Sequence, residues 1–269
     1  MNVYLFELKS QLRAFLLGTG SLLVVTVLLL AGAYPIYRDS KASVEQVIAG
    51  FPPQFAALFG VSGDMFSFGG FYRFSSLYLM LIAAIMAAAW GLSIFSREQR
   101  SKSTDFLFVM PISRRQLYLT KLVAGLTLVV IAVLLYLAAI GLLYGRYRND
   151  ATAMAISLPR LLLAACSLFG IAILFLSFGA LTAILMHRVR SVSGIATAFG
   201  VIGFMLVSLP EMTGDNKYRI VAPFTWFNID EALTHGRYEA GYIALAVAVT
   251  LICLIVGAVV YVRRDVNAA

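Results

Sequence analysis

The sequence predicts an all-α membrane protein that crosses the bilayer six times, and three observations lead to this fold class. Only 13% of the 269 residues are charged, whereas soluble domains carry about 25%. The charges are clustered, so that six long apolar runs contain none. Each run reaches or nearly reaches the ~20 residues that a spanning helix needs. Lipid offers the backbone no hydrogen-bond partner, so these runs should be helices.

The six spans are expected in one transmembrane domain that covers residues 1–269. Their approximate positions are 14–36, 74–96, 117–145, 161–186, 191–209 and 240–262; the uncharged run of the third span begins at Leu122, after Lys121. The first run could be read as a secretory signal, because Lys9 and Arg13 precede it and Ala31-Gly32-Ala33 has the small residues of a cleavage site. Its apolar stretch is too long for a signal core of about 7–15 residues. We therefore expect an uncleaved first span.

The charges between the spans predict the orientation. Six spans place both termini on one side, together with residues 97–121 and 187–190. These segments and the two ends hold 12 Lys or Arg residues and 4 Asp or Glu, whereas the other connections hold 9 of each. The positive-inside rule makes the first set cytoplasmic. The net charge of +8 then reflects topology in the cell membrane and gives no indication of a nucleic-acid partner.

Residues 1–13 predict a weakly amphipathic helix that lies in the membrane interface before the chain turns into the first span. One face holds apolar side chains and the opposite face polar ones. The apolar face comprises Tyr4, Leu5, Leu8 and Leu12, and the polar face Glu7, Lys9, Ser10 and Arg13. A frayed terminus is the alternative.

The connection between the second and third spans contains an apolar stretch among charges. Ser103 or Thr104 can cap a short helix, and the apolar residues 106–110 follow. Pro111 ends this helix, and Ser113-x-x-Gln116 forms a capping box for the third span. A plain loop does not need this apolar stretch, so the short helix should dock on lipid headgroups or on another protein.

This connection resembles the first cytoplasmic loop of permease subunits of ATP-binding-cassette (ABC) transporters of the type-2 exporter class. The matching positions are Glu98, Thr104, Asp105, Leu107, Pro111, Ser113, Arg114 and Lys121, while Ser103 stands where the family has Gly. Residues 222–228 (Ala-Pro-Phe-Thr-Trp-Phe-Asn) and the tail 262–266 (Val-Arg-Arg-Asp-Val) are also similar to stretches of that family. The resemblance covers nearly the whole chain.

The resemblance implies a permease that exports an amphipathic, drug-like, peptide or lipid-like substrate. It implies an N-terminal elbow helix and a coupling helix between spans two and three that docks on a separate ATPase subunit. Two ATPase copies and a second permease copy, as a homodimer, complete the transporter, with membrane lipids around it. The docking residues are expected to be Arg97, Glu98, Thr104, Asp105, Phe106, Leu107, Phe108, Pro111, Arg114 and Arg115.

The outer segments 35–73 and 210–239 predict short helices at the outer leaflet, because capping residues, prolines and aromatic side chains alternate in them. The resemblance implies that these pieces gate the outer end of the pathway; membrane anchoring without substrate contact is the alternative. The outer gate candidates are Phe51, Phe55, Phe59, Phe224, Trp226 and Phe227.

The sequence does not indicate an enzyme. It lacks the Gly-x4-Gly-Lys-Ser/Thr phosphate loop, so ATP and Mg are expected in the partner subunit and no cofactor on this chain. The two histidines, His187 and His235, fall on opposite sides of the membrane, and no His-Glu-x-x-His zinc motif exists. The main alternative is a membrane sensor or interaction module without transport. An ion-coupled carrier is disfavoured because no span has an ionisable residue in its core.

Overall fold

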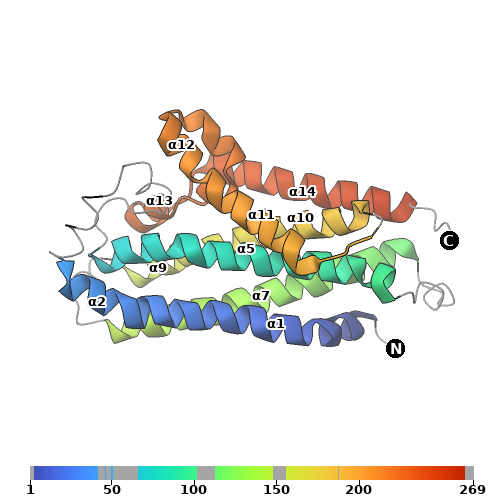
Figure 1. The fold of residues 1–269 in the computed structure, drawn as a ribbon, viewed down its shortest axis with the longest axis horizontal. Coiled ribbons are helices and arrows are strands. Elements are labelled where there is room, and N and C mark those ends of the chain that lie inside the picture. The colour runs from blue at the N-terminus through green and yellow to red at the C-terminus, as the bar shows by residue number, and fades with distance from the viewer. Residues whose placement is uncertain are drawn as a thin grey trace.

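The computed structural model describes residues 3–41, 46, 50, 66–101, 113–147, 156–186 and 188–263. All regular structure in these residues is helical, and six helices are long and apolar enough to cross a membrane (Figure 1). They are Val3–Asp39, Phe68–Arg97, Arg114–Arg146, Leu158–Leu185, Val192–Pro210 and Ala240–Arg263. The six predicted spans are therefore confirmed. Most ends differ by a few residues, but the first helix begins well before the predicted start.

The spans are built from the following elements. The first comprises α1 (Val3–Val27), the π-helical segment η1 (Leu28–Ala33) and α2 (Tyr34–Asp39), the second is α5 (Phe68–Ser101), and the third is α7 (Arg114–Arg146). The fourth comprises α9 (Leu158–Ala165) and α10 (Ser167–Leu185), the fifth α11 (Val192–Leu206) continued by α12 (Ser208–Thr213), and the sixth α14 (Ala240–Arg263). Short helices η2 (Asn216–Val221), η3 (Pro223–Thr225) and α13 (Ile229–Thr234) precede α14, as predicted for this segment.

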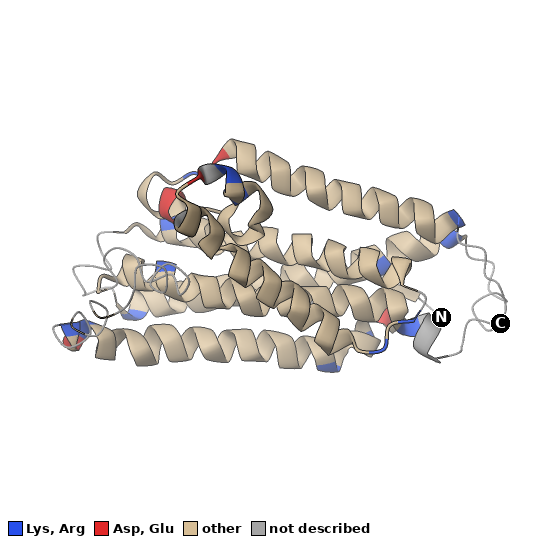
Figure 2. Ribbon diagram, turned by 45° about the horizontal axis from the view of Figure 1, so that its top comes forward, with Lys and Arg blue, Asp and Glu red and all other residues tan. Residues whose placement is uncertain are grey.

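The first helix begins, and the last helix ends, at the same end of the bundle, as six crossings require (Figure 1). We call this the N/C end and the opposite one the far end. Lys, Arg, Asp and Glu gather at the two ends of the described structure, and the middle of the bundle is almost free of them (Figure 2). Charges avoid the middle because an ionised side chain there is costly in lipid. The arrangement is that of a multi-pass membrane protein.

Helices α5 and α10 form the centre of the bundle, and their backbones are in contact where they cross. A Cβ atom added to Gly91 would lie 2.3 Å from the carbonyl oxygen of Leu176, and one added to Gly179 would lie 2.3 Å from that of Ala88. Small residues at a crossing let two membrane helices approach this closely. Helices α1 and α11 pack against α5, and α14 packs against α10.

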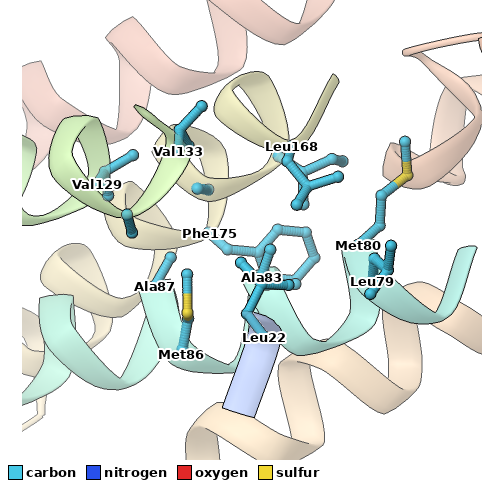
Figure 3. Close-up of a cluster of buried hydrophobic side chains, with 14 of the residues drawn as sticks. Leu22, Leu79, Met80, Ala83, Met86, Ala87, Val129, Val133, Leu168 and Phe175 are labelled. Atoms are coloured by element: carbon cyan, nitrogen blue, oxygen red, sulfur yellow. The ribbon is translucent and has the colours of Figure 1, made fainter. Parts of the chain in front are cut away.

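Apolar side chains fill the space between the helices. Buried side chains from α1, α5, α7 and α10 form one apolar cluster that includes Phe175 (Figure 3). Other large apolar side chains lie on the outside of the bundle, such as Leu17 with 76% of its surface exposed and Leu142 with 78%. In a membrane such faces meet lipid or another apolar surface.

The π-helical segment η1 has an identifiable cause in Pro35. In an α-helix the ring of Pro35 would clash with the carbonyl of Ala31, and the wider π-helix relieves such a clash. In the π-helical register Tyr34 donates its N–H to the carbonyl of Leu29, five residues earlier. Pro35 has no N–H to give to Leu30. The hydroxyl of Tyr147, at the far end of α7, donates to the Leu30 carbonyl instead, at 2.9 Å.

The N-terminal residues differ from the predicted interfacial elbow helix. Helix α1 runs from Val3 to Val27 without a break, so residues 3–13 continue the first span. The expected faces are only partly present. Lys9 and Arg13 are exposed as expected, but Glu7 and Gln11 are buried. Leu5 and Leu12, expected on the apolar face, are each 52% exposed. The reason is that the polar side chains find partners in the bundle: Gln11 donates from Nε2 to Ser93 Oγ at 3.0 Å.

Candidate functional site

Helix α5 ends and helix α7 begins at the N/C end of the bundle (Figure 1). The predicted coupling helix itself lies outside the described residues. Helix α5 leads into the segment 102–112, and α7 continues from it. Ser113 caps α7 as predicted: its Oγ accepts from the Gln116 N–H at 3.3 Å, and its own N–H donates to Gln116 Oε1 at 3.3 Å. The capping box is thus confirmed and fixes where the third span begins.

The predicted docking residues fall into two groups. Thr104, Asp105, Phe106, Leu107, Phe108 and Pro111 lie outside the described residues. Arg97 and Glu98 lie on the last turns of α5, and Arg114 and Arg115 on the first turn of α7. Arg115 is exposed, whereas Arg97 and Arg114 are partly buried and contact the bundle. Their role in docking stays a prediction.

A buried ion pair lies next to these flanks and joins α1 to α7. The Lys121 side chain is 0% exposed and the Glu7 side chain 5%, and their Nζ and Oε1 atoms lie 2.7 Å apart. Lys121 Nζ also donates to the carbonyl of Ile94 on α5 at 2.9 Å. Burying two charges is costly unless they are paired and hydrogen-bonded, and this lysine meets both conditions. One ammonium group therefore ties three spans together.

Arg97 approaches the same carboxylate from α5. Its Nη1 atom lies 3.9 Å from Glu7 Oε2, an ion pair that is too long for a hydrogen bond. Both of these atoms are buried and have no hydrogen-bond partner among the residues that the structure describes. The Arg97 guanidinium also stacks over the ring of Phe6, 4.6 Å from its centroid. We call Glu7, Arg97, Lys121 and the Ile94 carbonyl the anchor cluster.

The start of α7 is also tied to the sixth span. Tyr118 donates its hydroxyl to the carbonyl of Leu254 on α14 at 2.8 Å, and Arg114 donates more weakly to the carbonyl of Val262 at 3.5 Å. Arg114, Tyr118 and Lys121 are spaced by four and three residues, so they lie on one face of α7. The helix that follows the segment 102–112 is thus attached through this face to spans one, two and six.

Sequence reasoning missed the role of Glu7, which it placed on a water-facing side of the N-terminal helix. The signal that could have found it is a pattern of three residues. Glu7 and Gln11 share a helix face directly before an apolar run, and Lys121 is a lone cation in the uncharged start of the third span. A lysine in such a position needs a buried acceptor.

At the far end, the described gate candidates are packed rather than exposed. Phe224, Trp226 and Phe227 have 4%, 4% and 7% of their surfaces exposed. The Phe227 ring fills the notch left by Gly170, where an added Cβ would lie 2.1 Å from it. The Phe224 ring contacts the Phe175 ring at 5.5 Å between centroids. These residues anchor the segment 208–234 to the fourth span. Phe51, Phe55 and Phe59 lie outside the described residues, and the gating role stays a prediction.

A polar network lies next to these aromatic residues at the far end. Arg219 Nη2 lies 2.8 Å from Glu239 Oε1, and Asn228 Nδ2 donates to the same oxygen at 2.9 Å. Trp226 donates its indole N–H to the Arg219 carbonyl at 2.8 Å. The hydrogen bonds from Arg219 hold the pKa of Glu239 below its ordinary value, and Asn228 acts in the same direction. The network joins η2, η3 and α13 to the start of α14.

Replacing Glu239 with Gln should destabilise the protein at neutral pH by ~1 kcal/mol, because the charged form of the carboxylate holds the network together. The folded-state pKa is below the unfolded value of about 4.5, so the ionised group stabilises the fold above that pH. This contribution is lost as the pH falls through the folded-state pKa. Melting curves in detergent should show a difference between parent and Glu239→Gln at pH 7 that shrinks towards pH 4. A difference that does not change with pH would contradict this assignment.

The fold is that of a multi-pass helical membrane protein, in which the segment 102–112 joins the second span to the third. The sequence comparison identifies the family. The chain belongs to the ABC-2 family of transporter proteins, whose sequence model matches residues 1–266. This match confirms the resemblance to ABC-2 permeases. No curated protein and no solved structure matches the chain. The protein is therefore a membrane subunit of an ABC-type transporter.

Proposed function

We propose that this chain is the permease subunit of an ATP-driven exporter that moves an amphipathic substrate outward. ATP and Mg bind to a separate ATPase subunit, and the segment 102–112 is the docking site for that subunit. Two permease copies, as a homodimer, and two ATPase copies form the working transporter. The N/C end is cytoplasmic, in agreement with the excess of Lys and Arg in the segments assigned to it.

The observation that carries this proposal is the attachment of the third span at its start. The segment 102–112 is followed by a capped helix whose first two turns contact α1, α5 and α14 through Lys121, Tyr118 and Arg114. A force applied to the segment therefore reaches several spans at once. In the proposed transporter, ATP binds to the partner subunit and not to the spans. A connection from the docking segment to several spans is therefore needed for ATP binding to change the arrangement of the spans.

The proposal is tested by first determining whether a Walker-motif ATPase is encoded beside this chain, and by co-expressing the permease with that ATPase. The purified complex is reconstituted in liposomes, and two amphipathic probes are followed, the dye Hoechst 33342 and an NBD-labelled phospholipid. The measured quantity is the amount of probe moved per ATP hydrolysed, for whichever probe the parent moves. Replacing both Phe106 and Leu107 with Asp should reduce this ratio by about tenfold or more, because charges at the centre of an apolar contact are costly. The matched control is Phe106→Leu with Leu107→Met, which keeps the contact apolar.

Three outcomes separate the possible functions. ATP-dependent movement of either probe that the Asp pair reduces and the apolar pair preserves supports the proposal. Equal transport per ATP by both pairs would remove the docking role from Phe106 and Leu107. Co-purification of the chain without any ATPase, and no movement of either probe, would instead favour a sensor or interaction module.

A further inference from the structure

Glu7 is the one residue of the described structure that contacts cations from both flanks of the segment 102–112. Arg97, on α5, precedes the segment, and Lys121, on α7, follows it. Both approach the Glu7 carboxylate, at 3.9 Å and 2.7 Å respectively. Glu7 itself belongs to neither flank, because it lies near the beginning of α1. The carboxylate therefore joins the two ends of the segment to the first span.

The two contacts of Glu7 differ in strength. The Oε1 atom accepts a short hydrogen bond from Lys121, which is itself fixed by the Ile94 carbonyl. The Oε2 atom faces Arg97 without a hydrogen bond, and the Arg97 side chain is 34% exposed. The lysine contact is therefore the fixed one. The arginine contact can tighten or open through a small movement of the end of α5, with little effect on the lysine.

A purely structural role does not require these charges. A buried ion pair adds little stability compared with apolar side chains of similar volume, because removing both charges from water is costly. The neighbouring spans are apolar and offer many such residues. An electrostatic contact that spans three helices, by contrast, is sensitive to distance and can hold one arrangement against another in a low-dielectric interior.

We propose that Glu7 is a positioning residue for energy coupling. It holds Lys121 firmly and Arg97 loosely, so that a displacement of the segment 102–112 moves α1 together with α5 and α7. This inference rests on the proposed function, since it assumes an ATPase bound at that segment. The conformational change then reaches the far end through the first span as well as through the second and third.

The experiment measures transmission to the far end without knowledge of the substrate. Cys166 and Cys253 are replaced with Ser, and the exposed Met212 on α12 with Cys, which is labelled with the fluorophore bimane. The complex with the ATPase is then treated with MgATP and vanadate, and the change in bimane emission is recorded. Glu7→Gln should bind and hydrolyse ATP as the parent does but reduce the emission change at least about fivefold, within the usual range of coupling energies. Lys9→Gln, an exposed charge on the same helix, should leave the change intact.

A second variant keeps the test decisive if Glu7→Gln elutes as an aggregate. Glu7→Gln combined with Lys121→Met leaves no buried unpaired charge and should remain monodisperse, yet it also removes the connection. An emission change within twofold of the parent in either soluble variant would overturn the positioning role. A parent that binds no ATPase and shows no change would overturn the proposed function, and this inference with it.

Discussion

Replacing Lys121 with Met should lower the free energy of unfolding by about 3–5 kcal/mol, which is the loss expected when one partner of a buried ion pair is removed. The Lys121 side chain is 0% exposed, and it donates a 2.7 Å hydrogen bond to the Glu7 carboxylate. Met has a similar volume, so the loss does not come from a cavity. It comes from a carboxylate left buried without its cation, and from the Ile94 carbonyl left without its donor.

A double-mutant cycle separates this loss from simple repacking. Lys121→Met, Glu7→Gln and the combination of both are unfolded by titration with SDS in mixed micelles. The combination should be more stable than Lys121→Met alone, because it contains no buried charge without a partner. Arg115→Met, at an exposed position on the same helix turn as Arg114, serves as the control and should change stability by less than about 0.5 kcal/mol. Equal losses for Lys121→Met and Arg115→Met would show that the pair is not buried between the helices.

The positions of the six spans could be predicted from the sequence because the signal for a spanning helix is local. A run of apolar residues reports on its own solvent, whatever the rest of the chain does. The capping box of Ser113 and Gln116 could also be predicted, since both residues belong to one helix turn. In both cases the residues that interact are close together in the sequence.

The anchor cluster could not be predicted because its contacts are long-range. The Glu7 carboxylate meets an amine 114 residues away, and helical periodicity carries no information about such a partner. The same limit explains why Glu7, expected on the polar face, is buried in the bundle. An amphipathic helix in the interface turns its polar side to water, but a helix that continues a span turns it towards whichever helix offers hydrogen bonds. Ser93 and Lys121 offer them here.

The outer segment shows both situations. Asn228 caps α13 through bonds to the N–H groups of Asp230 and Glu231, a local pattern that the sequence contains. The burial of Phe227 depends on the glycine at position 170, in another span. Small residues in spans are easily noticed, but which surface each one receives becomes visible only when the helices are assembled.

Replacing Gly91 or Gly179 with Ala should each cost about 3 kcal/mol, the upper part of the usual range for overpacking. In both cases the added Cβ would lie 2.3 Å from a backbone carbonyl oxygen of the facing helix, which cannot rotate away as a side chain can. The helices α5 and α10 must separate to accept either methyl group. Because they separate at one crossing, the losses of the two variants should not add: the double variant should lose clearly less than the sum.

Gly141 provides the matched control, because an added Cβ there meets nothing within 4 Å in the part of the chain that the structure describes. Gly141→Ala should raise the stability slightly, since Ala favours a helix over Gly by up to about 1 kcal/mol. SDS titration and melting curves in detergent measure all four proteins. Losses at Gly91 and Gly179 no larger than the effect at Gly141 would mean that the two backbones are not in contact. The central pair would then not be the rigid support on which the other spans pack, and the force from the N/C end would have to travel by another route.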